Sequence, residues 1–419
     1  MHTSAPQPSR LMPTTRPQVS GHRFMRRRVE HGLLFGDIRM IHDPLATRRR
    51  ATIFGLVAVA LIAAVMALFA WLRPNSDPGD APILRDPAGN LFVRVDGTVH
   101  PVANLASARL VAGAAEEPAR TSDEHLATLP RGVPIGVQNA PSVFAPEDAA
   151  DVVWSVCAAD EVTVVAGAEP RALGDGEAVL AEVDGAQWIF TREGRTLLPA
   201  EETPEGRIVR RVLGITADTP RWRPPADVAA AARELPPIAF PSPLPEVLTS
   251  EAGAWLVAPW GGIQVITDTQ RTALADAGAT LHDVPRTAPA EQPDAAPAFD
   301  LRLPAAVPQW LRPGGETVCV TESGGAAAAP AADLERGAAA LSGDAVATRF
   351  AGLAQGAVGV DTGRGYHVVS IHGLRQEVEG RDALTVLGAR RVESAPWRIL
   401  TLLPEGPKLS RGAAVRATY

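Results

Sequence analysis

An uninterrupted apolar segment at residues 51–72 constrains this chain more than any other feature of its sequence. Its 22 residues carry no charge. At about 1.5 Å of rise per residue, they would form a helix long enough to cross a bilayer core of about 30 Å. A cleavable signal has an apolar region of only about 7–15 residues behind a short charged leader, whereas 50 residues precede this segment. We therefore expect a permanent membrane anchor in preference to a cleaved signal or a buried core helix.

The charges on the two sides of the apolar segment predict its orientation. Residues 1–50 contain ten arginines and three acids, and Arg48, Arg49 and Arg50 adjoin the segment directly. The residues after position 50 contain 30 basic and 44 acidic side chains. Basic residues beside an anchor remain on the cytoplasmic side of the membrane. We expect a cytoplasmic N-terminus and an exported region at residues 73–419, on the outer side of the cell membrane.

The cytoplasmic part divides into two segments. Residues 1–18 contain prolines and no apolar pattern, and we expect them to be disordered. Residues 19–50 carry an apolar stripe in steps of four, four, three and four, which is typical of one face of a helix; its members are Met25, Val29, Leu33, Gly36 and Met40. Ser20 is the expected N-cap, and Pro44 predicts an end near Asp43.

Three consecutive arginines accompany this stripe: Arg26 flanks it, and Arg27 and Arg28 lie off it. A basic amphipathic helix beside a membrane can dock on another protein through its apolar stripe, with the arginines meeting acids. It can instead lie on anionic lipid, or act only as a topology signal. We favour docking through Met25, Val29 and Leu33, and the other two roles remain open.

Four stretches of the exported region share a pattern that predicts β-hairpins. Each has an aromatic residue at its first or second position, several β-favouring residues, a glycine, and then an apolar residue. These stretches are residues 91–102, 187–198, 254–266 and 366–378. The expected turn glycines are Gly97, Gly194, Gly262 (or its neighbour Gly261) and Gly373. Residues 104–113 and 380–389 carry leucines and valines near helical spacing, so we expect hairpin–helix repeat modules.

Apolar or alternating stretches between the hairpins predict a β-rich central domain: residues 151–157, 161–167 and 316–324. The expected fold class is therefore α+β, with one N-terminal transmembrane helix followed by an extended exported region of β-hairpin/helix repeats around that central domain. Residues 220–245 and 285–313 are rich in proline and alanine and are typical of linkers or surface loops. A short helix is expected at residues 226–235.

Both cysteines of the chain, Cys157 and Cys319, follow the anchor. Disulfides persist in exported regions. A bond between these two would close a loop of about 160 residues, which the chain-entropy model values at roughly 5 kcal/mol. Two buried free thiols are the alternative.

The common catalytic fingerprints are missing from the sequence. A P-loop needs a lysine after a glycine-rich run, but the single lysine, Lys408, follows Pro407, and Leu402 stands where the first glycine is required. The patterns G-x-S-x-G, C-x-x-C and H-E-x-x-H do not occur. His367 and His372 share one hairpin, and their separation of five predicts opposite faces of a continuous strand. We expect no catalytic residue, no metal ligand and no cofactor.

Four segments carry a resemblance to a known family. "SGHRFMRRRVEHGLLFGDIRMIHDPL" at residues 20–45, followed by an anchor, resembles the N-terminus of EccB, a core membrane component of actinobacterial type VII (ESX) secretion systems. Residues 79–111 and 129–144 resemble the segments that follow the anchor in that family, and residues 395–414 resemble its closing stretch. The matches occur in order and cover nearly the whole chain.

The resemblance implies periplasmic repeat domains around a β-rich core, a disulfide, and self-association. It also implies assembly with EccC, the motor ATPase, and with EccD and EccE into a ring-like complex in which the cytoplasmic segment contacts the motor. The expected function is a structural and assembly subunit that braces this ring, with no nucleic-acid partner. Members of the family have been described as ATPases, and no motif here supports that activity. A nucleotide hydrolase without a P-loop and a cell-envelope-binding module are the alternatives.

Overall fold

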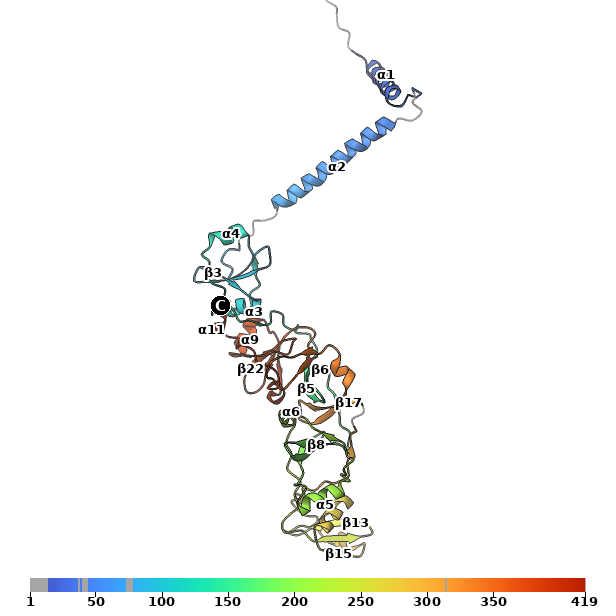
Figure 1. Ribbon diagram of the computed structural model, residues 1–419, viewed down its shortest axis with the longest axis vertical. Coiled ribbons are helices and arrows are strands. Elements are labelled where there is room, and N and C mark those ends of the chain that lie inside the picture. Colours follow the sequence, from blue (N-terminus) through green and yellow to red (C-terminus); the bar gives the residue numbers. More distant parts are fainter. Residues whose placement is uncertain (1–13, 37, 40–43, 73–77, 313–314, 419) are drawn as a thin grey trace, which may run out of the picture. The chain divides into compact units, whose positions relative to one another are not determined.

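The computed structural model describes residues 14–36, 38–39, 44–72, 78–312 and 315–418 (Figure 1). The chain divides into two compact units, Met1–Ser76 and Asp77–Tyr419. The first unit contains the helices α1 (Arg16–Phe35) and α2 (Pro44–Leu72). The second contains the described strands and the shorter helices. The fold is α+β, with one apolar N-terminal helix followed by a β-rich region, as the sequence predicts.

The second unit contains four copies of one arrangement, which we call repeats 1 to 4. In each copy, three antiparallel strands are followed by a helix and by a fourth strand, which pairs in parallel with the first. The strand order in each sheet is therefore third, second, first, fourth. The predicted hairpins are the second and third strands of these copies.

The strands and the helix occur in the same order along the chain in every repeat. Repeat 1 comprises β1 (Ile83–Arg85), β2 (Leu91–Val95), β3 (Thr98–Val102), α3 (Leu105–Ala112) and β4 (Ala119–Arg120). Repeat 2 comprises β8 (Glu177–Val183), β9 (Ala186–Thr191), β10 (Gly194–Leu197), α5 (Pro204–Val212) and β11 (Arg221–Trp222). Repeat 3 comprises β12 (Val247–Ser250), β13 (Gly253–Val257), β14 (Ile263–Ile266), α7 (Asp268–Asp276) and β15 (Leu281–Asp283). Repeat 4 comprises β21 (Val358–Asp361), β22 (Tyr366–Val369), β23 (Arg375–Val378), α9 (Arg381–Leu387) and β24 (Val392–Ser394).

Local chemistry explains why each hairpin leads into a helix. In repeats 1, 2 and 3 the residue before the helix is Asn104, Thr203 or Thr267, and its side-chain oxygen accepts a backbone N–H of the first turn at 2.8, 3.0 and 3.2 Å respectively. Such N-caps satisfy donors that the helix itself leaves unpaired. The helices expected at residues 104–113 and 380–389 are confirmed as α3 and α9.

A seven-stranded sheet forms the central domain, in the order β19-β20-β6-β5-β17-β18-β7. Its strands are β5 (Val153–Ala158), β6 (Val162–Gly167), β7 (Arg171–Ala172), β17 (Glu316–Thr321), β18 (Ala326–Pro330), β19 (Ala339–Ala340) and β20 (Arg349–Ala351). The three predicted central stretches are β5, β6 and β17. Because repeats 2 and 3 lie in the sequence between β7 and β17, they are inserted into this sheet.

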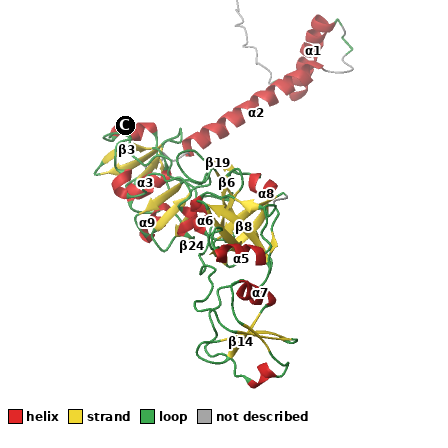
Figure 2. Ribbon diagram, turned by 60° about the horizontal axis from the view of Figure 1, so that its bottom comes forward, coloured by secondary structure: helices red, strands yellow, loops and turns green. Residues whose placement is uncertain are grey.

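The repeats pack in two pairs, each around a shared hydrophobic core. Repeats 1 and 4 bury residues such as Val93 and Leu384 together, and α3 packs on α9 (Figure 2). Repeats 2 and 3 bury residues such as Leu180 and Leu274 together, and α5 packs on α7. The first and last repeats of the chain therefore form one body.

Strand β8 shows how repeat 2 joins the central domain. Ala178 and Leu180 belong to the core shared with repeat 3, whereas Val179 and Ala181 belong to the core beneath the central sheet. Neighbouring residues of a strand point to opposite faces, so β8 is buried on both sides. This explains its nearly continuous apolar sequence.

The C-terminal residues 396–418, which we call the C-terminal strap, connect the central domain with the body formed by repeats 1 and 4. The strap contains α10 (Trp397–Leu400) and α11 (Arg411–Ala414). Leu400 lies in the core of the central domain, whereas Leu409 and Ala414 lie in the core of repeats 1 and 4. Between the two helices, the Leu409 N–H donates to the carbonyl of Glu377 in β23 at 2.8 Å.

The two proline-rich segments are not free linkers, in contrast to the sequence-based expectation. The segment 220–245 contains β11 and the expected short helix, α6 (Ala226–Ala231), and it buries Trp222 and Ile238. The segment 285–313 contains the 3₁₀ helix η1 (Ala288–Glu291) and β16 (Gln309–Trp310), which pairs with β8, and it buries Leu303. Apolar side chains scattered along both segments pack these segments against the rest of the second unit.

The remaining helices are α4 (Asp123–Thr128) and α8 (Ala331–Glu335).

Arg109 joins the first and last repeats through polar contacts. This α3 side chain is 8% exposed, and its Nη1 donates to the carbonyl of Leu387 at the end of α9, at 2.9 Å. Its Nη2 donates to Glu117 Oε1 at 2.6 Å. We predict that Arg109→Ala destabilises the chain by about 1–3 kcal/mol, because a buried carbonyl loses its donor.

Thermal unfolding of the full chain in detergent measures this effect. Arg120→Ala, which removes an exposed arginine from β4 of the same repeat, is the matched control and should leave the midpoint unchanged. Equal midpoints for the two variants would contradict the role given to Arg109.

Candidate functional site

Helix α2 is the candidate membrane anchor. Among the described residues, one helical segment, Thr47–Trp71, is long and apolar enough to cross a membrane, with a mean hydropathy of 2.8. Its large apolar side chains, such as Phe54, Leu61 and Trp71, are exposed. A helix that is apolar on all sides fits hydrocarbon, where its backbone groups are satisfied internally. The helix starts before the predicted segment and includes Arg48, Arg49 and Arg50.

Helix α1 carries the predicted docking stripe, although its bounds differ from the prediction. Thr15 and not Ser20 is the N-cap, and Thr15 and Gln18 form a capping box. The helix ends at Phe35, and Gly36 follows in the left-handed conformation. The expected end at Asp43, like the stripe residue Met40 and most of residues 1–18, lies outside the described residues.

The stripe on α1 is open to solvent. Met25, Val29 and Leu33 are 56, 57 and 81% exposed. At 100° per residue they span one face, and Arg27 points to the opposite side. Arg26 donates to Glu30 at 3.1 Å. The exposed apolar face has the form of a docking surface.

Cys157 and Cys319 form a disulfide between neighbouring strands of the central sheet. They lie directly opposite each other in the antiparallel pair of β5 and β17, with Cα atoms 3.9 Å apart. Both are buried with Ala327 and Ala329 in a small cluster separate from the main core. The sequence predicts both cysteines on β-strands but does not predict that these strands are neighbours. The two cysteines meet because β5 pairs with β17.

Three of the four predicted turn glycines occupy hairpin loops. Gly97, Gly262 and Gly373 have φ of 79, 82 and 77°, a region that favours glycine. A Cβ at Gly373 would also lie 2.6 Å from the Phe350 side chain. Gly194 is different, because it is the first residue of β10 and follows the turn. A side chain there would overlap the carbonyl of Arg233, so close backbone packing explains this glycine.

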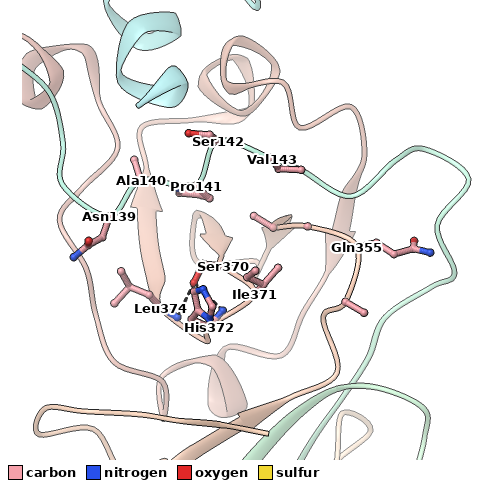
Figure 3. A pocket seen from close by; sticks show the side chains of 13 residues that line it. Asn139, Ala140, Pro141, Ser142, Val143, Gln355, Ser370, Ile371, His372 and Leu374 are labelled. Atoms are coloured by element: carbon pink, nitrogen blue, oxygen red, sulfur yellow. Dashed lines mark hydrogen bonds between the residues drawn. The ribbon is translucent and has the colours of Figure 1, made fainter. Parts of the chain in front are cut away.

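An apolar pocket with a volume of about 630 Å³ lies at the hairpin turn of repeat 4 (Figure 3). Apolar side chains from three segments form its wall, including Pro141, Ile371 and Leu374. Figure 3 shows the side chains of Asn139 and Gln355 turned away from it. The Ser370 hydroxyl accepts the backbone N–H of Leu374 at 3.1 Å and so stabilises the turn. No Asp, Glu, Lys or Arg is among the residues that line it.

A second apolar surface, in which one side chain is exposed and two are half-buried, lies on the sheet of repeat 3. Leu248, Trp255 and Val265 are neighbours in register across β12, β13 and β14, on the face opposite the core. Val265 is 71% exposed. The outer faces of repeats 2 and 4 are covered by the central domain, and that of repeat 1 packs on Leu126 of α4. Large exposed apolar patches mark interaction surfaces.

The described residues offer little for catalysis. They contain no group of three or more His, Cys, Asp and Glu side chains that could hold a metal ion. A smaller pocket beside β8 is lined by charged residues, among them Glu177 and Arg192. The Gly174 N–H and Arg171 both bind the Glu177 carboxylate, which lowers its pKa. A carboxylate held in its charged form in this way is a poor proton acceptor at neutral pH.

We predict that the disulfide contributes about 2–5 kcal/mol to the stability of the second unit, because it links strands 162 residues apart in the sequence. A Cys157→Ala/Cys319→Ala variant should unfold at a lower temperature than the oxidised protein. A reductant should lower the midpoint of the wild type and leave that of the double variant unchanged. A wild-type midpoint that does not respond to complete reduction would contradict the prediction.

Comparisons with known proteins agree with these features. Residues 11–418 match a family model described as "Type VII secretion system ESX-1, transport TM domain B". The ESX-1 secretion system ATPase EccB1 of Mycobacterium tuberculosis is 28% identical over 457 residues, covering 96% of this chain and 94% of that protein. The ESX-3 secretion system ATPase EccB3 of the same species is 33% identical over 288 residues, covering 64% of this chain and 52% of that protein.

Solved structures show the same fold. A chain of the intact ESX-5 inner membrane complex matches with a TM-score of 0.64 at 24% identity, covering 98% of this chain and 97% of that one. A chain of the EccB3 dimer from the ESX-3 core complex matches with a TM-score of 0.65 at 22% identity, covering 80% of this chain and 100% of that one. Since the family model spans nearly all residues, this chain belongs to the EccB family of type VII secretion systems.

Proposed function

We propose that this chain is a structural and assembly subunit of a type VII protein-secretion complex in the cell membrane. The observation that carries this proposal is the family match over residues 11–418, which includes the apolar helix and the exported repeats together. The solved relatives are a chain of an ESX-5 inner membrane complex and a chain of an EccB3 dimer from an ESX-3 core complex. The two exposed apolar surfaces of the second unit suit contacts with further subunits or with a second copy.

The proposed topology places residues 19–50 in the cytoplasm, residues 51–72 in the membrane and residues 73–419 outside. Two observations support it. The arginines before and beside the apolar segment favour a cytoplasmic position for residues 19–50. The disulfide favours a position outside the cytoplasm for residues 73–419, because such bonds persist there. The subunit would then brace a ring of EccC-, EccD- and EccE-like partners from outside while its inner segment contacts the motor.

The inner contact rests on α1. Burying Met25, Val29 and Leu33 contributes at most roughly 1.5–3 kcal/mol for each side chain. Exposed ion pairs made by Arg26, Arg27 and Arg28 contribute about 0–1 kcal/mol each and weaken with salt. Apolar packing should therefore dominate the affinity, and the arginines should set the orientation of the helix.

We predict that Met25→Asp/Val29→Asp/Leu33→Asp releases the motor subunit from the complex and leaves membrane insertion intact, because Arg48–Arg50 and the apolar segment are unchanged. Co-purification from native membranes, with partners identified by mass spectrometry, measures the loss. A matched control adds the same charge to exposed apolar residues outside the stripe, as Val19→Asp/Phe24→Asp/Leu34→Asp. Arg26→Gln/Arg27→Gln/Arg28→Gln should have a smaller, salt-sensitive effect.

Two outcomes of this experiment would end the docking proposal. If the stripe variant retains its full set of partners, α1 is a topology signal. If the stripe and control variants lose partners equally, added charge rather than the stripe is responsible.

The curated relatives are called ATPases by name, which makes nucleotide hydrolysis the second candidate. The 630 Å³ pocket has no charged residue in its wall, and in the smaller charged pocket beside β8 the Glu177 carboxylate is engaged by Arg171. We predict no phosphate release from the purified full chain above a mock preparation from the same host. Release that stays proportional to this chain through successive purification steps would favour the hydrolase.

A further inference from the structure

A buried histidine lies where the C-terminal strap meets repeat 4. His367 is in β22 and is 4% exposed. Its ring lies 5.2 Å from the ring of Trp397, the first residue of α10, at an interplanar angle of 36°. The guanidinium carbon of Arg375 lies 4.9 Å from the centre of the same indole. The indole at the start of the strap therefore contacts a histidine and an arginine of repeat 4.

The charges around His367 come from β23 and from the strap. Arg375 donates to Glu405 of the strap at 2.9 Å. Glu377 stands opposite His367 in the sheet and accepts from Lys408 of the strap at 2.8 Å. Both carboxylates near the imidazole are thus already paired with cations. The imidazole Nδ1 is buried and has no hydrogen-bond partner among the described atoms.

Protonation of this ring is unfavourable while the strap is closed. A charged imidazole needs an acceptor for each N–H, and the buried Nδ1 faces none. Burial is the main cause that lowers the pKa of His367 below its ordinary value of 6.5, and Arg375 lowers it further. A hydrogen bond with the backbone of Gly365, together with Glu377 and Glu405, acts in the opposite direction, and each of these has a smaller effect than burial or Arg375.

We propose that His367 is an acid-sensitive latch for the C-terminal strap. While neutral, the imidazole packs under Trp397 and leaves the Arg375–Glu405 pair in place. When protonated, it repels Arg375 and needs solvent, so Trp397 and the strap detach. Because Leu409 and Ala414 carry the strap into the core of repeats 1 and 4, detachment also loosens that pair.

The direction of the pH dependence follows from the lowered pKa. The open form binds a proton at the ordinary histidine pKa, whereas the closed form resists it. Closure is therefore complete above about pH 6.5 and weakens as the pH falls toward the lower pKa of the closed form. If the closed ring stays neutral at pH 5, the population of the open form increases by up to about 30-fold between pH 8 and pH 5.

Hydrogen exchange of the full chain in detergent, followed by mass spectrometry at pH 8 and pH 5, tests the latch. Protection factors, corrected for the intrinsic pH dependence of exchange, are compared for the strap. In the wild type, protection over residues 397–414 should fall up to about 30-fold at pH 5. In His367→Phe and His367→Gln, the protection should be the same at both pH values. His367→Phe keeps a ring beneath Trp397, and His367→Gln serves if the larger ring fails to fold.

The matched control is His372→Gln, which removes an exposed histidine from the loop between β22 and β23. It should respond to pH as the wild type does. Three results would overturn the latch: equal wild-type protection at both pH values, a full pH response in the His367 variants, or a loss of protection at pH 5 that is as large in repeat 3 as in the strap.

Discussion

The shared cores of the paired repeats are the constraint on which the second unit, Asp77–Tyr419, depends. A sheet of four short strands with one short helix has two apolar faces and too little of its own chain to cover both. Each repeat meets this need by facing another: repeat 1 faces repeat 4, and repeat 2 faces repeat 3. The free faces of repeats 2 and 4 then pack on the central domain. If one repeat is removed, the apolar face of its partner is exposed to solvent.

This arrangement gives a physical basis to a scaffolding role. The central sheet collects strands from before and after repeats 2 and 3, and its disulfide fixes β5 to β17 at the middle of that sheet. Contacts made by one repeat are thereby held in a fixed relation to the rest of the exported unit. The apolar surfaces on repeats 3 and 4 suit contacts with other subunits.

Much of the local structure was predictable, because its signals are local. Alternating apolar residues and Asp-Gly or glycine-containing turns indicated the hairpins, and apolar runs indicated β5, β6 and β17. The fourth strands β4 and β11 gave no signal, since they have two residues each, too few to show a period. The first strand β8 has seven residues, but it is buried on both sides and so shows no alternation. The start of α1 was missed although Thr15 and Gln18 form a capping box, because Pro17 suggested a break where it is compatible with a first helical turn. Pairing of the repeats depends on contacts such as Arg109 with Leu387, 278 residues apart, and no local pattern reports them.

The pairing of the first repeat with the last has a consequence for biogenesis. Under the proposed topology, a chain threaded across the membrane delivers repeat 1 first, while the residues that cover its inner face are delivered later. During that interval Val93 and Leu110 have no permanent partner, and repeats 2 and 3 complete their own pair in the meantime. The nascent exported region is therefore most vulnerable to proteases and to aggregation next to the membrane. A copy that lacks repeat 4 would leave the inner face of repeat 1 uncovered.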